Sequence, residues 1–446
     1  MRIKWFSLVR IVGLSLVLLY HFFQGVFPGG FIGVDVFFAF SGFLITSLLI
    51  DEFARSQEID IKGFLMRRFY RISPPLVFMI LITLPFTLFI RKDFVASIGT
   101  QIAGALGFVT NFYEMLSGGN YESQFIPHLF VHTWSLALEV HYYILWAIAV
   151  YFLAKKSRTV GQFRGMIFLV STGVFLFSFL SMFISGFFTK NFSLIYFSSW
   201  THIFPFFAGT ALATISGVKN VGANFKKLEK SWSLQQTLGM IGGSFVVLLL
   251  LGFLLRFDNI FTYLVGFLIA TVAALIMILG ARVLHEKTPQ LEEPIWVTFI
   301  ADTSYGVYLF HWPFYIIFSQ LVGNILAVLI TTILSFAFAA VSFYILEPVL
   351  AGRKQDLFGI QMDVKSIARP IFYSLIPLAI ISFLITVTAP KVGAFEEDLM
   401  INALHQADSK LQLTRSQADQ TTATDYNVAS GTTLIGDSVA LRANEW

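Results

Sequence analysis

Long apolar runs separated by short polar stretches dominate this chain of 446 residues. A helix that spans a bilayer needs about 20 mostly apolar residues, because the hydrocarbon core is about 30 Å thick and a helix rises about 1.5 Å per residue. Eleven runs meet this requirement, and they lie at 5–24, 31–52, 74–90, 133–154, 165–187, 195–215, 237–255, 260–281, 296–320, 324–346 and 370–389. The pattern predicts an all-α polytopic membrane protein with about eleven transmembrane helices.

The charges between these runs predict the orientation of the chain. Cytoplasmic loops carry an excess of Lys and Arg. The basic loops are 53–73, 155–164, 216–236, 282–295 and 347–369. They fall on one side only if a further apolar run, 95–113, does not cross, so we expect that run to lie in or re-enter the outer face. The N-terminus is then cytoplasmic and the C-terminus extracellular, in a cell membrane.

Composition narrows the classes of function. Hydrophobic residues make up 56% of the chain and charged residues 13%, about half the charged share of soluble domains. The net charge of +4 is modest, so we expect a lipid bilayer and no nucleic acid as partner. The chain has no cysteine, which excludes disulfides, thiolate metal ligands and a cysteine nucleophile. Arg10 interrupts the first apolar run, so we expect a retained span rather than a signal peptide.

The composition changes after Pro390, where a polar segment begins. Near its end, a β-branched run turns through Gly436 and Asp437 into Ser438, a pattern typical of a strand that leads into a nucleophile loop. The predicted divisions are a membrane domain at 1–350, a cytoplasmic loop with an extra transmembrane helix at 351–390, an extracellular linker at 391–430 and the start of a second domain at 431–446.

Two ionisable residues, Arg10 and His21, lie inside the first apolar run. Such residues are costly within a bilayer and by default mark a functional site. On one helix they lie about 16 Å apart along the axis. A snorkelling arginine and a carbonyl-bonded histidine explain them equally well at this point. Arg67, Arg68 and Arg71 suit phosphate groups, although each also fits ordinary positive-inside charge.

Two predicted helical faces collect polar residues at i, i+4 and i+7; they are Ser135, Glu139 and Tyr142, and Ser304, Tyr308 and His311. The ionisable residues predicted at similar depth near the outer face are His21, Asp35, Glu139 and His311. We expect these four to converge on one site, where a histidine beside a carboxylate forms an acid–base pair. An inner arginine cluster and an outer His–Glu site fit one elongated donor, and acetyl-coenzyme A has that shape.

Other polar residues receive mainly structural interpretations. His128 and His132 have an i, i+4 ligand spacing, but the sequence offers no obvious third ligand, so we expect no metal. His141 faces away from Glu139, and we expect it to be structural, like Glu347 at an inner helix end. No function is expected for His202, His285 and His405.

Five motifs in order resemble the membrane acyltransferase-3 family over roughly residues 1–350. They are Arg10-x10-His21, Gly33-Val34-Asp35-Val36-Phe37-Phe38 with Ser41-Gly42-Phe43, Arg67-Arg68-x2-Arg71-Ile72-x-Pro74, Trp134-Ser135-Leu136-x2-Glu139 and Ser304-Tyr305-x2-Tyr308-x2-His311-Trp312-Pro313. The C-terminal Gly436-Asp437-Ser438 is similar to the start of the α/β SGNH-hydrolase-like domain that is fused to one subgroup of the family, here with only its first strand.

The resemblance implies transfer of acetyl from cytosolic acetyl-coenzyme A across the membrane to the SGNH serine. The acetyl then passes to the C6 hydroxyl of N-acetylmuramic acid in peptidoglycan, which hinders lysozyme. By the family pattern, the catalytic residues are His21, Arg10, Glu139, His311 and Ser438. The substrate-binding residues are Arg67, Arg68, Arg71, Asp35, Ser135, Tyr305 and Tyr308. Acetyl-coenzyme A is the only cofactor expected, as donor, with no metal.

Several features depart from the family pattern or leave alternatives open. His141 and Tyr142 stand where the family often has Gln-Phe, and Ala147 replaces a frequent Pro. The later SGNH motifs are absent, so we do not expect this chain alone to complete the acceptor step. A different cell-envelope glycan is an alternative acceptor. A transporter or flippase is an alternative function, although the sequence lacks repeated halves.

Overall fold

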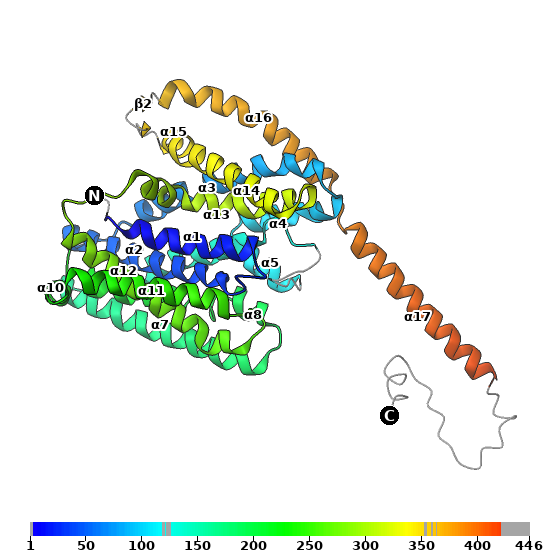
Figure 1. Ribbon diagram of the computed structural model, residues 1–446, viewed down its shortest axis with the longest axis horizontal. Coiled ribbons are helices and arrows are strands. Elements are labelled where there is room, and N and C mark those ends of the chain that lie inside the picture. The colour runs from blue at the N-terminus through cyan, green and yellow to red at the C-terminus, as the bar shows by residue number, and fades with distance from the viewer. Residues whose placement is uncertain are drawn as a thin grey trace, which may run out of the picture. The chain divides into compact units, whose positions relative to one another are not determined.

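The structure is a computed structural model of the chain, and it describes residues 3–117, 121, 126–351, 355–357, 360–362 and 364–420. Its contacts divide the chain into two units, Met1–Lys391 and Val392–Trp446. The first unit is a bundle of helices (Figure 1). The predicted start of an SGNH domain, with Ser438, lies outside the described residues.

The elements of the first unit run in chain order as follows. Its first part contains α1 (Phe6–Phe22), η1 (Gly30–Ile32), α2 (Gly33–Ser56), α3 (Ile61–Thr83), η2 (Leu84–Phe89), η3 (Lys92–Val95), α4 (Ile98–Leu106), α5 (Thr110–Leu116), η4 (Val131–Thr133), α6 (Trp134–Lys156), α7 (Val160–Phe188), α8 (Phe192–Phe197) and α9 (Phe204–Ser216). Its second part contains α10 (Ala223–Ser231), α11 (Leu234–Leu254), η5 (Thr262–Gly266), α12 (Phe267–Lys287), α13 (Ile295–Leu321), α14 (Asn324–Val341), η6 (Ser342–Leu346), α15 (Glu347–Ala351), β1 (Gln355–Leu357), β2 (Ile360–Met362) and α16 (Val364–Thr388).

Each apolar run that was predicted to cross the membrane is helical over much of its length, but the run at 195–215 is divided between the end of α8 and α9. Within the described residues, eight helices are long and apolar enough to cross a membrane by length and composition. The other three predicted runs correspond to α1 and α9, which are shorter apolar helices, and to α13. At 27 residues, α13 is about 40 Å long and carries the polar residues Tyr308 and His311 among its apolar ones. The chain is therefore an all-α, multi-pass membrane protein.

The ambiguous run at 95–113 folds into two short helices, α4 with 9 residues and α5, which begins in this run, with 7. Neither reaches the length of about 20 residues that a crossing helix needs. Phe108 lies between them with φ 54°, in the left-handed region, so the chain turns sharply there. The structure thus agrees with the expectation that no single helix crosses at this run.

Helix α2 lies at the centre of the bundle. Its apolar window is 83% buried, against 11% for α16. It packs closely on α9, because a β-carbon at Gly209 would lie 1.9 Å from the carbonyl oxygen of Ala39. Gly42 faces α9 in the same way. This contact fixes Ser41 and Asp35 of α2 inside the protein.

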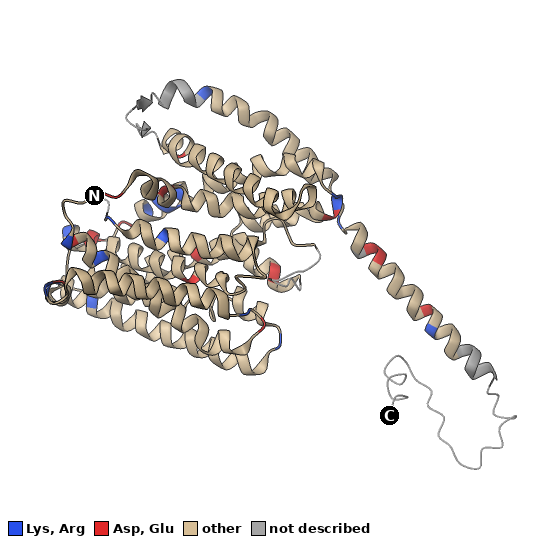
Figure 2. Ribbon diagram, in the orientation of Figure 1, with Lys and Arg blue, Asp and Glu red and all other residues tan. Residues whose placement is uncertain are grey.

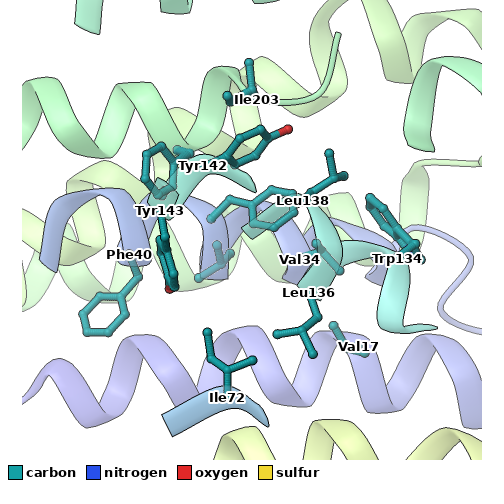
Figure 3. Packing of buried hydrophobic residues seen from close by; sticks show 14 of the residues in the cluster. Val17, Val34, Phe40, Ile72, Trp134, Leu136, Leu138, Tyr142, Tyr143 and Ile203 are labelled. Atoms are coloured by element: carbon teal, nitrogen blue, oxygen red, sulfur yellow. The ribbon is translucent and has the colours of Figure 1, made fainter. Parts of the chain in front are cut away.

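The packed core that surrounds α2 is seen in Figure 3, where labelled side chains include Val17, Phe40, Leu136, Tyr142 and Tyr143. Basic and acidic residues of the first unit lie mainly near helix ends, and many of the basic ones gather at the end where the N-terminus lies (Figure 2). That arrangement is the one that a positive-inside orientation requires.

Two features, a strand pair and a helix, were not predicted from the sequence. A short antiparallel pair, β1 and β2, lies in the predicted cytoplasmic loop. In the second unit, α17 (Ala394–Gln420) makes most of the predicted linker helical. Its 27 residues contain no Gly or Pro and many good helix formers, which explains the difference from an irregular linker.

Candidate active site

Three cavities in the first unit contain most of the predicted site residues. The arginine cavity, of about 720 Å³, is lined in part by Arg10, Arg67, Arg68 and Arg71. The glutamate cavity, of about 160 Å³, is lined in part by Ser41, Ser135, Glu139, Tyr143 and Tyr308. The histidine cavity, of about 520 Å³, is lined in part by His21, Tyr121, His132 and Trp312. The first two cavities adjoin each other, because Arg10, Arg68 and Arg71 line both.

Two arginines of the arginine cavity have carboxylate partners. Arg71 forms an ion pair with Glu347, and Arg67 lies 3.7 Å from a carboxylate oxygen of Glu52. Arg68 differs, because its buried Nε has no hydrogen-bond partner among the described residues. A buried donor without an acceptor is costly, so Arg68 is the arginine best placed to take a ligand. Glu347, at the inner helix end, holds Arg71 at this cavity.

Glu139 accepts hydrogen bonds in a compact cluster at the glutamate cavity. Ser41 Oγ donates to Glu139 Oε1 over 2.6 Å, and Tyr143 OH donates to the same oxygen. The Ser41 and Tyr143 hydroxyl oxygens lie 2.5 Å apart. Ser41 comes from α2, and the other two residues lie one turn apart on α6. Since Arg68 lines the same cavity, a carboxylate, a serine hydroxyl and a guanidinium share one small space.

Two imidazoles from distant parts of the chain meet at the histidine cavity. His21 Nδ1 lies 2.7 Å from His311 Nε2, and His311 Nδ1 lies 2.6 Å from the carbonyl oxygen of Tyr308. A carbonyl oxygen only accepts, so His311 carries its proton on Nδ1 and accepts at Nε2. A neutral His21 therefore donates from Nδ1 and keeps its lone pair on Nε2. That nitrogen lies 3.5 Å from the hydroxyl of Tyr121.

A layer of hydrogen bonds separates the glutamate and histidine cavities, whose described linings have no residue in common. Tyr308 OH lies 2.6 Å from Ser135 Oγ and donates to the carbonyl oxygen of His132 over 2.8 Å. His132 in turn donates from Nε2 to the carbonyl oxygen of Leu309 over 2.9 Å. Tyr308 thus contacts both sides, since its side chain lines the glutamate cavity and its carbonyl holds His311.

The predicted convergence of four ionisable residues on one site is wrong. His21 and His311 meet, but Glu139 lies in a different cavity. Asp35 is not among the described residues that line the three cavities, and its Oδ1 lies 3.1 Å from His202 Nε2 with both side chains fully buried. The position of a residue along its helix predicts its depth in the membrane, but it does not predict which neighbouring helix the side chain faces. His202, for which we expected no function, is the partner that compensates the buried Asp35.

Other predicted residues are accounted for individually. His128 contacts Glu114 over 2.8 Å, so it does not pair with His132 around a common ligand. Within the described residues, no group of three or more His, Cys, Asp or Glu side chains could hold a metal ion. Tyr305 lines the glutamate cavity and donates to a backbone carbonyl. Tyr142 also donates to a backbone carbonyl and does not join Glu139.

The sequence did not identify Ser41, Tyr143 and His202 as site or partner residues. A signal existed for Tyr143, which lies at i+4 from Glu139 on one helical face. Ser41 belongs to a family motif but was given no role, because its partner Glu139 lies 98 residues away. No local signal existed for His202, which lies 167 residues from Asp35.

Comparison with known proteins shows which family the chain belongs to. A family model of acyltransferase domains, Acyl_transf_3, matches residues 3–347. The O-acetyltransferase OatA of Staphylococcus aureus strains NCTC 8325 and COL is 31% identical over 304 residues, which cover 67% of this chain and 48% of OatA. The protein SACOL0978 of strain COL is 29% identical over 310 residues, which cover 68% of this chain and 49% of that protein. The chain thus spans about half the length of these relatives. No solved structure matches it.

Proposed function

The chain belongs to the acyltransferase-3 family, and from that premise we propose that it is a membrane O-acetyltransferase. Its donor is acetyl-coenzyme A from the cytosol, and its final acceptor is the C6 hydroxyl of N-acetylmuramic acid in peptidoglycan. The observation that carries the proposal is the hydrogen-bonded chain from the Tyr308 carbonyl through His311 to His21, which leaves a basic ring nitrogen at a cavity.

The donor binds with its phosphates in the arginine cavity and its acyl-bearing arm in the glutamate cavity. Four arginines, Arg10, Arg67, Arg68 and Arg71, supply the planar donor groups that suit phosphate. Because the two cavities adjoin, one extended molecule can occupy both. Ser135, Tyr305 and Tyr308 line the narrower part and contact the arm.

His21 acts as the general base of the transfer step. Its Nε2 takes the proton of the attacking hydroxyl, and the resulting imidazolium donates from Nδ1 to His311. Arg10 holds the donor from the same helix, rather than touching His21, because it lines only the arginine and glutamate cavities among those described. Asp35 supports α2 through His202 and does not bind substrate.

The acceptor part of the proposal rests on the relatives and on the resemblance at the C-terminus. The matched relatives include proteins named O-acetyltransferase OatA. Ser438 is proposed as the extracellular serine that receives the acetyl group before peptidoglycan does. In this orientation the N-terminus is cytoplasmic and α17 is extracellular, in a cell membrane. A different cell-envelope glycan is the narrower alternative, and a transporter or flippase without chemistry is the broader one.

Release of thiol from acetyl-coenzyme A tests the proposal, because a transporter leaves the thioester intact. The purified chain is reconstituted in liposomes, with a complete SGNH domain and peptidoglycan fragments supplied on the side opposite the donor. We expect continuous thiol release that falls by about 10²–10⁴-fold in His21→Ala, the usual contribution of a general base. His405→Ala, on the exposed face of α17, is the matched control. An intact donor with every variant would contradict the proposal.

A further inference from the structure

An acyl group held in the glutamate cavity cannot contact His21 in the structure. His21 lines the histidine cavity, and the layer formed by Tyr308, Ser135 and His132 lies between the two. The first group to accept the acyl therefore has to be in the glutamate cavity itself, beside the donor. This step rests on the proposed function, and it concerns how that function begins.

Ser41 has the surroundings that a nucleophilic serine needs. Its Oγ donates to Glu139 Oε1 over 2.6 Å, so a base is already hydrogen-bonded to the proton that has to leave. Glu139 lies half-buried on α6 and lines the same cavity as Ser41, so the base faces the space that the donor would occupy. The guanidinium of Arg68 lines the same cavity with its buried Nε unpartnered among the described residues, which provides a donor for the oxyanion that forms during attack.

The other hydroxyls of the glutamate cavity are engaged differently. Ser304 donates to a carbonyl within its own helix, and Tyr305 donates to the carbonyl of Ile72. Ser135 and Tyr308 bond to each other and to a backbone carbonyl. Ser41 and Tyr143 differ from these hydroxyls, because both donate a hydrogen bond to the carboxylate of Glu139.

We propose that Ser41 is the first acyl acceptor and that Glu139 is its general base. Ser41 Oγ attacks the thioester carbonyl, and Glu139 takes the hydroxyl proton. The new C–O bond forms, the C–S bond breaks, and the proton passes from Glu139 to the leaving thiolate, so an acyl-serine ester and a free thiol result. The Tyr143 hydroxyl lies within hydrogen-bond distance of both Glu139 and Ser41 and keeps the two side chains in position. Opening of the Tyr308 layer then exposes the ester to the acceptor that His21 activates.

Mapping of the acyl group tests this proposal. The full chain in liposomes receives acetyl-coenzyme A labelled in the acetyl group and no acceptor, and the quenched protein is digested for mass spectrometry. In His21→Ala we expect close to one acetyl group per chain, on Ser41. An alkyl ester resists neutral hydroxylamine, whereas an acyl-imidazole does not. Ser41→Ala is expected to lose the label and at least 100-fold in the rate of thiol release. Ser47→Ala, a buried serine of the same helix, serves as control.

The outcomes separate this inference from the proposed function. Acetyl found on Tyr143 or on His21 in the parent chain overturns the role of Ser41 while leaving acetyl transfer intact. A folded Ser41→Ala that releases thiol at the parent rate does the same. Because the acetyl position is read in chains that retain Ser41, the result does not depend on whether Ser41→Ala folds. No thiol release from the parent chain overturns the proposed function and this inference together.

Discussion

In the glutamate cavity a carboxylate accepts hydrogen bonds from two hydroxyls beside an arginine, whereas in the histidine cavity a backbone carbonyl orders two imidazoles. The first arrangement carries charge and adjoins four arginines, so it suits a phosphate-bearing donor and the oxyanion of thioester attack. The second presents a ring nitrogen that can take and return a proton. In our proposal the donor step and the acceptor step therefore use separate chemical groups, divided by the Tyr308 layer.

Loss of the charge on Glu139 should have the largest effect on the donor side. Glu139→Gln keeps the shape of the side chain but removes the proton acceptor for Ser41. We expect thiol release to fall by about 10²–10⁴-fold, the range for a general base, with the protein still folded. Glu58→Gln, an exposed residue after α2, is the matched control. A Glu139→Gln chain that releases thiol normally would show that this carboxylate is not the base.

Changes at His311 should affect the acceptor side instead. His311→Leu removes the group that sets the His21 tautomer, and we expect acetyl transfer to acceptor to fall by about 10²-fold while the first equivalent of thiol is still released. His311→Gln can accept a hydrogen bond at the same place and should recover part of the loss. Equal losses of thiol release and of transfer in both variants would mean that the two cavities do not act separately.

The arginines should differ in their effect on donor binding. Arg68→Ala removes a half-buried guanidinium whose Nε is buried, and a charge-assisted hydrogen bond contributes about 1.5–3 kcal/mol, so we expect the KM for acetyl-coenzyme A to rise about 10–100-fold. Arg67→Ala should raise it less than about 5-fold, because Arg67 is half exposed beside Glu52. KM values measured by thiol release decide the order. A larger effect at Arg67 would contradict the assignment of Arg68 as the main ligand.

Weakening of the layer between the cavities should have the smallest effect. Tyr308→Phe keeps the ring and the carbonyl that holds His311 but removes the hydroxyl that bonds to Ser135 and His132. A neutral hydrogen bond contributes about 1 kcal/mol, so we expect a change of about 5-fold in acetyl transfer. Uncoupled loss of the acetyl group to water, measured as thiol release without transfer, should rise. Unchanged coupling would argue against a barrier at Tyr308.

The sequence was sufficient to predict the helical class and the positions of most of the long apolar helices. Apolar runs of about 20 residues are local features, so α2, α3, α6 and the others follow directly from them. The distribution of basic loops along the chain indicated that 95–113 does not cross. Local features did not show that α17 is helical, because a polar segment without Gly or Pro is compatible with both a helix and a linker.

The site was only partly predictable, because its contacts are long-range. Helical periodicity places Glu139 and Tyr143 on one face but does not identify the helix opposite, so the contact of Ser41 with Glu139 was not predicted. His21 and His311 were both identified, yet their contact joins residues 290 apart. Asp35 and Glu139 seemed equivalent by depth, but they differ in partner, since Asp35 pairs with His202 in a closed interior.

The central claim is that the glutamate cavity and the histidine cavity act in succession. Rapid-quench measurement of thiol release in the parent chain and in His21→Ala tests this claim most directly. With acetyl-coenzyme A in excess, and with a complete SGNH domain and peptidoglycan fragments present, the parent should release thiol continuously. His21→Ala should release about one equivalent at nearly the parent rate and then stop, because the donor step does not need the histidine cavity. If His21→Ala releases no thiol even in the first turnover, donor cleavage needs His21 and the two-cavity account is wrong.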